Sequence, residues 1–296
     1  MNTRSKSFLC LFLALLCACL CWAVDARTLL TPVSVTATGG GADLDIASLR
    51  GKAHITLTSL NTAGTSPTLA TKLQESEPLI MGQVYTTTGT NDIVLRNGTN
   101  DNIKLSASFT QSGAHQVKRV GLRLKNNGTI TAGKLMTLTI ETDTAGDPTG
   151  TALGTADTVL CSAVGTTYDW VVFTFAKPVD LADATVYHLV LAGDYTVSSS
   201  NNITWRTATV ASGGNANVYD SAYAAVTTNS REFYIHEYNF SDVTGGGFTT
   251  LSTAGNTTVQ TLEFNIDELK PIIRAYFTIG GTSNPAFTTA MTVHGN

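Results

Sequence analysis

Apolar residues recur with a period of two along most of this chain. In "KLMTLTIETD", Met136, Leu138 and Ile140 fall on one face of an extended segment, with threonines between them. Alternation of this kind predicts a half-buried β-strand. The same pattern recurs in five further segments: Ile55 and Leu57, Leu69 to Leu73, Val120 to Leu124, Val171 to Phe175, and Leu262 to Ile266.

Turn signals separate these segments, and no segment of helical period and length lies between them. The turns are Asn97-Gly98, Asn127-Gly128, Gly213-Gly214 and Gly245 to Gly247. Many short strands at this spacing favour an all-β fold of antiparallel, jelly-roll-like β-sandwiches. The exception is "DELK", where we expect one helical turn that Asp267 caps and that Pro271 ends.

Two similar phrases lie near opposite ends of the chain. "LNTAGTSPTLATKL" runs from Leu60 to Leu73, and "FTIGGTSNPAFTTAMTV" runs from Phe277 to Val293. A tandem repeat would carry its flanks along, but the residues before the two phrases differ. We therefore interpret the phrases as halves of one domain.

The residues between these phrases have a strand pattern of their own, which predicts a second sandwich inserted into a loop of the first. The predicted host domain comprises residues 27–80 and 240–296, and the inserted domain comprises residues 81–239. The alternative is a single large β-domain over the same residues.

Residues 1–26 resemble a secretory signal peptide. Arg4 and Lys6 precede an apolar run from Phe8 to Val24, and Val24 and Ala26 fit a small-residue cleavage site. The run is shorter than a membrane span, so we expect cleavage, no remaining span, and a secreted or cell-envelope location. The alternative is lipoprotein anchoring, because residues 16–19, "LCAC", approximate a lipidation box.

The net charge limits the expected binding partners, and the cysteine content limits the possible disulfides. Without the leader, the 18 basic and 22 acidic residues fall to 16 and 21, so the net charge is near −5. Such a chain is not expected to bind nucleic acid or anionic lipid. Cys161 is then the one cysteine left, so no internal disulfide can form. Its apolar surroundings, "DTVLCSAV", indicate a small buried residue and not a nucleophile.

Catalytic chemistry has no visible candidate set. The segment "HEYNF" at His236 lacks the second histidine of a zinc protease helix and alternates like a strand. The scattered histidines accompany no nucleophile motif or phosphate-binding glycine loop. We therefore expect no enzymatic activity and no cofactor. Asp143 and Asp147, in "TDTAGDPTG", could supply oxygens to a structural Ca²⁺, or could simply bond their own turn.

Aromatic residues offer a binding site instead. Trp205, Tyr219 and Tyr223 lie in a segment rich in Gly, Ser and Asn, where exposed rings could stack on sugars. Alternatively, Trp205 fills the core and the tyrosines pack beneath the loop. Trp170, at the start of a strand, is expected in the core.

Two resemblances suggest a role. The segments "GADLDIASLRGKAHITL", "GTSPTLATKLQES", "VTGGGFTTLSTAG" and "VQTLEFNIDELKPIIRAYFTIGGTSNPAFT" resemble a small β-sandwich domain of tailed-phage virion proteins. The intervening block, from "ASFTQSGAHQVKRVGLRLKNNGTITAGKLMTLTIETDTAGDPTGTALGTADTV" to "REFYIHEY", resembles the choice-of-anchor R domain of secreted bacterial proteins, although His188 stands where that family has a large aromatic residue. Both resemblances imply display or assembly on a surface and neither implies catalysis.

The expected function is therefore that of an exported, non-enzymatic structural or display protein that mediates assembly or adhesion. Its partners would be other surface proteins or copies of itself. Two alternatives stay open. One is carbohydrate binding through the aromatic residues of the inserted domain. The other is an extracellular polymer in which a strand near Thr28 to Thr38 pairs with a neighbour's sheet edge.

Overall fold

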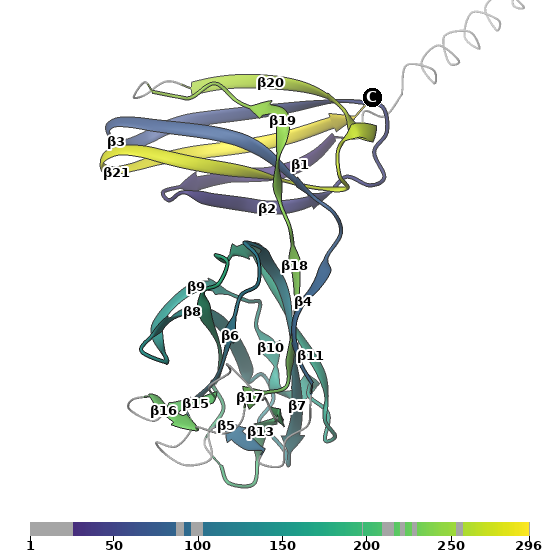
Figure 1. Cartoon of the computed structure of the whole chain (residues 1–296), viewed down its shortest axis with the longest axis vertical. Helices are drawn as coiled ribbons and strands as arrows, with labels where there is room; N and C mark the ends of the chain where they lie inside the picture. Colours follow the sequence, from purple (N-terminus) through teal and green to yellow (C-terminus); the bar gives the residue numbers. More distant parts are fainter. Residues whose placement is uncertain are drawn as a thin grey trace, which may run out of the picture. The chain divides into compact units, whose positions relative to one another are not determined.

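The computed structural model describes residues 26–86, 92–95, 103–196, 198–208, 216–219, 223–226, 230–252 and 257–295. Within them the all-β prediction is confirmed, because strands account for nearly all of the regular structure (Figure 1). The chain divides into two compact units. Unit 1 holds the residues up to Gly39, Asp43–Glu75 and the residues from Asp242 on, and unit 2 holds Gly40–Ala42 and Ser76–Ser241.

Unit 1 is built on one antiparallel sheet whose two longest strands come from opposite ends of the sequence. The strand order is β1 (Ala26–Val35), β21 (Ile272–Gly295), β3 (Lys52–Ser76) and β19 (Ser241–Gly247); β2 (Gly39–Asp45) also pairs with β21, and β20 (Thr257–Asn265) with β3. One face of these strands forms a single apolar core, which includes Ile55, Leu57, Leu73, Ile273, Phe277 and Met291. Both sequence-distant segments therefore contribute to the same core.

The two similar phrases meet each other in this sheet. Gly64, in β3, and Gly281, in β21, have φ angles of +107° and +113°, in the region that favours glycine. A Cβ on Gly64 would lie 2.7 Å from the Cα of Pro285, and a Cβ on Gly281 would lie 2.9 Å from the Cα of Pro67. Each glycine thus makes room for the proline of the other phrase.

Unit 2 is a sandwich of two antiparallel sheets. The first has the order β10 (Val159–Leu160), β8 (Leu135–Thr144), β12 (Val186–Gly193), β6 (Lys104–Thr110), β15 (Ala216–Tyr219) and β16 (Tyr223–Val226), with β9 (Asp147–Thr155) paired to β8. The second has the order β4 (Ile80–Tyr85), β18 (Phe233–Tyr238), β7 (Gln116–Asn127), β13 (Asn202–Trp205) and β5 (Ile93–Leu95), with β11 (Asp169–Asp180) also paired to β7. A short pair, β14 (Thr207–Ala208) and β17 (Ser230–Arg231), completes it.

The core of unit 2 lies between these sheets. The ring centroids of Phe109, on β6, and Phe233, on β18, lie 5.9 Å apart. Met136, Leu138 and Ile140 are fully buried, as their alternation predicts. Burial of several such side chains at about 1.5–3 kcal/mol each is the main favourable term for folding, since the described residues form no disulfide.

The short helical turns show one error in the sequence-based prediction. Residues Ile266–Glu268 form a 3₁₀ turn, η2, but Asp267 does not cap it. Asn265 takes that role, because its side chain accepts a hydrogen bond from the amide of Asp267. The second such turn, η1 (Cys161–Ala163), holds the thiol of Cys161. That thiol is free and buried, and burial raises its pKa to about 11, so the expectation of a buried, unreactive cysteine is confirmed.

The chain enters unit 2 at Ser76 and leaves it after Ser241. These ends lie close together, since the amide of Asn239 donates to the hydroxyl of Ser76 at 3.1 Å. Close ends are what the insertion of one domain into another requires. The insertion itself stays a prediction, and the unit boundaries differ by a few residues from the predicted 80/81 and 239/240.

Candidate functional site

Trp205 does not lie where the carbohydrate-binding interpretation needs it. Its side chain is fully buried, and its indole N–H donates to the carbonyl oxygen of Glu232 at 2.9 Å. Strand β13 places it in the core of unit 2 together with Ile203. Of the two interpretations of Trp205, burial in the core is confirmed and an exposed, sugar-stacking ring is not found, because the indole gains more from apolar burial with its one polar group bonded.

Tyr219 and Tyr223 lie directly opposite each other on β15 and β16. The structure describes their backbone, and their side chains lie outside the described part of the chain. Their predicted role as ligand-binding residues therefore stays a prediction.

Asp143 is the last residue but one of β8 and Asp147 is the first residue of β9, on either side of a tight turn. One carboxylate oxygen of Asp143 lies 2.8 Å from Nε2 of His188, which is fully buried, and the other accepts a hydrogen bond from the amide of Gly146. In the described part of the chain no three His, Cys, Asp or Glu side chains converge to hold a metal ion. Asp143 thus has a visible structural role as the partner of His188, which the sequence did not reveal.

A different group of aromatic and basic residues gathers on the outer face of the second sheet of unit 2. We call it the aromatic–cationic face; it consists of Arg119, Arg123, Lys125, Tyr168, Trp170, Arg206, Tyr234 and His236. Strand β7 explains the grouping, because Val120, Leu122 and Leu124 point into the core and the residues between them point outward. The register places His236 beside Arg119 and Trp170 beside Arg123.

The centre of this face is an aromatic pair. Trp170, on β11, and Tyr234, on β18, make an edge-to-face contact with ring centroids 4.8 Å apart, although β7 separates their strands. They can meet because Gly121 lies between them on β7. A Cβ at Gly121 would lie 2.2 Å from two carbon atoms of the Tyr234 ring. The absence of a side chain therefore lets Tyr234 lie flat over the strand.

Trp170 is half-buried on this outer face and does not enter the core, so the prediction that it is a core residue is wrong. The guanidinium of Arg123 lies 5.3 Å from the centroid of its ring. The neighbouring Val172 is 43% exposed. The sequence "DWVVFTF" is apolar in both alternating phases, so the alternation alone does not tell which phase faces the solvent.

The two ends of the face differ in charge. At one end, Lys125 and Arg206 both lie over the ring of Tyr168. The hydroxyl of Tyr168 donates to Asp92, and Arg206 pairs with Glu232 at 3.5 Å. Positive and negative charges are balanced there. At the other end, Arg119 and Arg123 have no carboxylate partner among the residues that the structure describes.

Burial shifts the pKa values of two side chains of the face, His236 and Tyr234. Burial, and then the nearby positive charge of Arg119, lower the pKa of His236, so His236 is neutral near pH 7. Burial raises the pKa of Tyr234, so its hydroxyl stays protonated and can donate a hydrogen bond. At neutral pH the charge at this end therefore comes from the two arginines.

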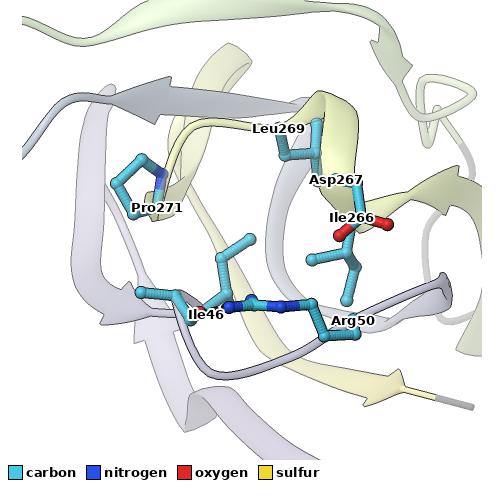
Figure 2. Close-up of a pocket in the computed structure, with 7 residues that line it drawn as sticks. Ile46, Arg50, Ile266, Asp267, Leu269 and Pro271 are labelled. Carbon is cyan, nitrogen blue, oxygen red and sulfur yellow. Dashed lines mark hydrogen bonds between the residues drawn. The ribbon is translucent and has the colours of Figure 1, made fainter.

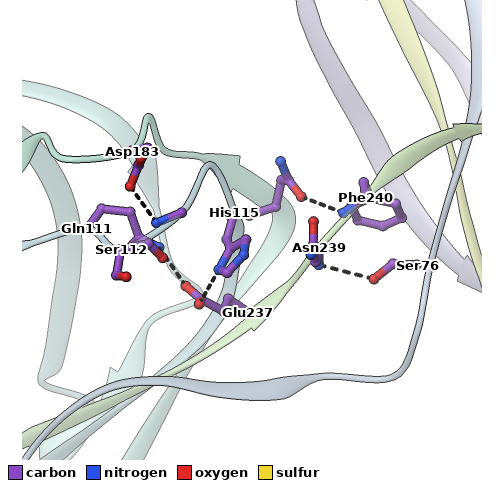
Figure 3. Close-up of polar contacts among 10 residues, drawn as sticks. Ser76, Gln111, Ser112, His115, Asp183, Glu237, Asn239 and Phe240 are labelled. Atoms are coloured by element: carbon purple, nitrogen blue, oxygen red, sulfur yellow. Dashed lines mark hydrogen bonds and ion pairs between the residues drawn. The ribbon is translucent and has the colours of Figure 1, made fainter.

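A buried polar cluster fixes the end of β18 next to the face (Figure 3). Glu237, which is 2% exposed, accepts a hydrogen bond from the side chain of Gln111 at 3.0 Å and lies 2.5 Å from Nδ1 of His115. Gly82, on β4, leaves the space for this carboxylate, because a Cβ there would lie 2.6 Å from it. These contacts anchor the strand that carries Tyr234 and His236.

Unit 1 contains a pocket of about 240 Å³ beside η2 (Figure 2). Ile46, Ile266, Leu269 and Pro271 form most of its wall. Arg50 borders it, but its guanidinium is engaged with the carbonyl oxygens of Ala47 and Leu49 at 2.5 and 2.6 Å. The pocket thus offers apolar wall and the carboxylate of Asp267, which is a weaker basis for recognition than the aromatic–cationic face.

Of the predicted signal peptide, residues 1–26, all but Ala26 lie outside the described residues, as does the lipidation box, so both stay predictions. In the described part of the chain, no helix has the length and apolar character needed to cross a membrane. Strand β1, which covers most of the segment proposed for polymer formation, pairs antiparallel with β21 from Ala26 to Val35. One of its edges is therefore already occupied within the chain.

No protein-family model matches this chain, and no curated protein matches it. Among solved structures, the chain is similar to infectious bursal disease virus, Gt strain, with 8% identity and a TM-score of 0.22 over 92% of this chain and 80% of that chain. It is also similar to the VP2 subviral particle of infectious bursal disease virus, with 9% identity and a TM-score of 0.22 over 92% and 81%. TM-scores this low assign neither a family nor a function, so both resemblances given above stay predictions.

Proposed function

We propose that this chain is an exported, non-enzymatic structural protein that adheres to a carbohydrate surface through the aromatic–cationic face of unit 2. The observation that carries the proposal is the contact between Trp170 and Tyr234. Two large rings held side by side on the outside of a sheet present an apolar surface that the folded unit itself leaves partly uncovered.

Sugar rings suit such a surface because their C–H faces are apolar and their edges carry hydroxyl groups. A sugar can therefore stack on the rings and still form hydrogen bonds at its edges, for example with the hydroxyl of Tyr234 and the guanidinium of Arg123. Rigid sheets hold both rings, so binding orders few side chains and loses little conformational entropy.

A binding assay on insoluble polysaccharides tests the proposal. The full-length protein is labelled and mixed with a panel of neutral and acidic polymers, and the bound fraction is compared with that of the Trp170→Ala/Tyr234→Ala variant. Tyr276→Ala is the matched control, because Tyr276 is a half-buried aromatic residue of unit 1 with Lys72 5.0 Å from its ring.

We expect binding to at least one polymer, loss of binding in the double variant and unchanged binding in the control. Chain lengths of the polymers, measured after long incubation, should not change, because the proposal includes no hydrolysis. Absence of binding to every polymer, or equal binding by wild type and double variant, would contradict adhesion through this face.

A further inference from the structure

The unbalanced end of the aromatic–cationic face points to the class of carbohydrate. We propose that this face recognises an acidic polysaccharide, with the carboxylates of uronic acid residues bound by Arg119 and Arg123 beside the Trp170–Tyr234 pair. This inference rests on the proposed function, since it specifies the ligand of the same face.

The first argument is that Arg119 and Arg123 have neither a hydrogen-bonded nor an ion-paired carboxylate among the described residues. Arg206, by contrast, pairs with Glu232, and Lys125 lies over the ring of Tyr168, whose hydroxyl donates to Asp92. Nε of Arg123 is buried and has no hydrogen-bond partner. A guanidinium has five N–H donors and binds carboxylates in a bidentate geometry, so this end of the face can accept anionic groups.

The second argument is contrast with the rest of the molecule. The chain as a whole carries a net charge of −4, so a general attraction to polyanions is not expected. Arg119 and Arg123 lie on one strand and have no carboxylate partner in the described part of the chain, so they create a local positive site in an acidic protein. Recognition of a polyanion would then depend on these residues and not on the overall charge.

The third argument is spacing. Arg119 and Arg123 are four residues apart on β7, which places their Cα atoms about 13 Å from each other along the strand. The register places Trp170 opposite Arg123 and Tyr234 opposite Gly121, so both rings lie along the interval between the arginines. A chain of several sugars can therefore stack on the rings while its carboxylates reach both guanidinium groups, whereas a single sugar could not.

The test uses polygalacturonate and its methyl-esterified form, which keeps the sugar backbone and removes the charge. Affinity of the full-length protein for each polymer is measured by isothermal titration calorimetry at low and high salt. The variant is Arg119→Gln/Arg123→Gln. Its control is Lys104→Gln/Lys134→Gln, which removes the same charge from the strand region of the other sheet.

We expect the unesterified polymer to bind, the arginine variant to lose at least tenfold in affinity, and the lysine variant to stay within about twofold of wild type. Binding should also weaken as salt rises. Circular dichroism confirms that both variants are folded.

Three results would overturn the inference. Equal affinity for the esterified polymer would show that carboxylates are not recognised, and the proposed adhesion would still stand if Trp170→Ala abolished it. An equal loss in the lysine variant would show that general charge is responsible. If neither polymer binds but a neutral polymer of the panel does, the recognition of acidic sugars is rejected and the proposed adhesion stands. If no polymer binds, both the acidic ligand and the proposed adhesion are rejected.

Discussion

Replacing each of the two described tryptophans with alanine separates the core from the proposed binding face. Trp205 is fully buried with its indole N–H bonded to a carbonyl oxygen, whereas Trp170 is half-buried on the outer face. We expect Trp205→Ala to destabilise unit 2 and Trp170→Ala to impair binding.

The magnitudes follow from the contacts. Truncation of a buried Trp to Ala costs about 3–5 kcal/mol, because transfer free energy is lost and a cavity remains. Trp170 loses an edge-to-face ring contact, about 0.5–1.5 kcal/mol, and a cation–π contact with Arg123, about 0.5–1 kcal/mol. For a unit of this size, about 2–4 °C of Tm per kcal/mol gives a fall of roughly 6–20 °C for Trp205→Ala and roughly 2–10 °C for Trp170→Ala.

Thermal unfolding followed by circular dichroism measures the stability of each variant. Polysaccharide binding is measured at 20 °C, or at a lower temperature where the variant is still folded. Trp170→Ala should bind at least tenfold more weakly than wild type, while the folded fraction of Trp205→Ala should still bind. The reasoning is refuted if Trp170→Ala is as destabilising as Trp205→Ala, or if Trp205→Ala stays stable and loses binding.

Three further predictions concern other positions. Gly121→Ala should push the ring of Tyr234 off the strand, weaken polysaccharide binding at least fivefold and lower the free energy of unfolding by less than about 2 kcal/mol. The control is Gly247→Ala, whose Cβ would have nothing within 4 Å; it should bind as wild type does in the same titration. Asp242→Asn should lower the free energy of unfolding at pH 7 by less than about 1 kcal/mol, because the carboxylate is half exposed, and Tm should fall slightly. Hydrogen bonds from Lys72 and Gln74 depress the pKa of Asp242, so this stability is present above the unfolded pKa and lost as pH falls through the folded pKa; an equal Tm difference at pH 3 would contradict this. Arg231→Met should raise the free energy of unfolding by about 1–4 kcal/mol, and with it the urea midpoint, because burial lowers the pKa of this guanidinium to about 10 and its nitrogens have no hydrogen-bond partner among the described residues; a lower midpoint would reveal a partner that stabilises it.

Much of the fold could be predicted because it depends on local pattern. Alternation identified the buried faces of β7 and β8, and the glycine-rich turns indicated antiparallel connections. Both similar phrases lie in unit 1 and contribute to one core, as halves of one domain would. The cap of η2 was missed because Asn265 and Asp267 are both good capping residues, and the backbone direction that decides between them comes from β20.

The candidate site could not be predicted in the same way. Whether Trp170 or Trp205 faces outward depends on which strands cover each face, and this is a property of pairing between segments distant in sequence. Trp205 lies in β13, which pairs with β5 and β7 and is buried at all four positions. The flanking Gly, Ser and Asn residues suggested exposure, but composition of a loop does not determine the burial of the strand beside it.

Gly121 shows how a site can arise from a residue with no chemistry of its own. A larger residue at this position would separate Trp170 from Tyr234 and leave each ring alone beside β7. An isolated glycine within a strand weakens the strand, so its presence at the centre of a well-paired sheet has a cost of about 0.5–1 kcal/mol. The close approach of the Tyr234 ring accounts for that cost structurally. If the pair served packing alone, an alanine at 121 with a smaller residue at 234 would satisfy the sheet equally well. Two adjoining large rings on an outer face instead leave partly exposed apolar surface, which the proposed ligand would cover.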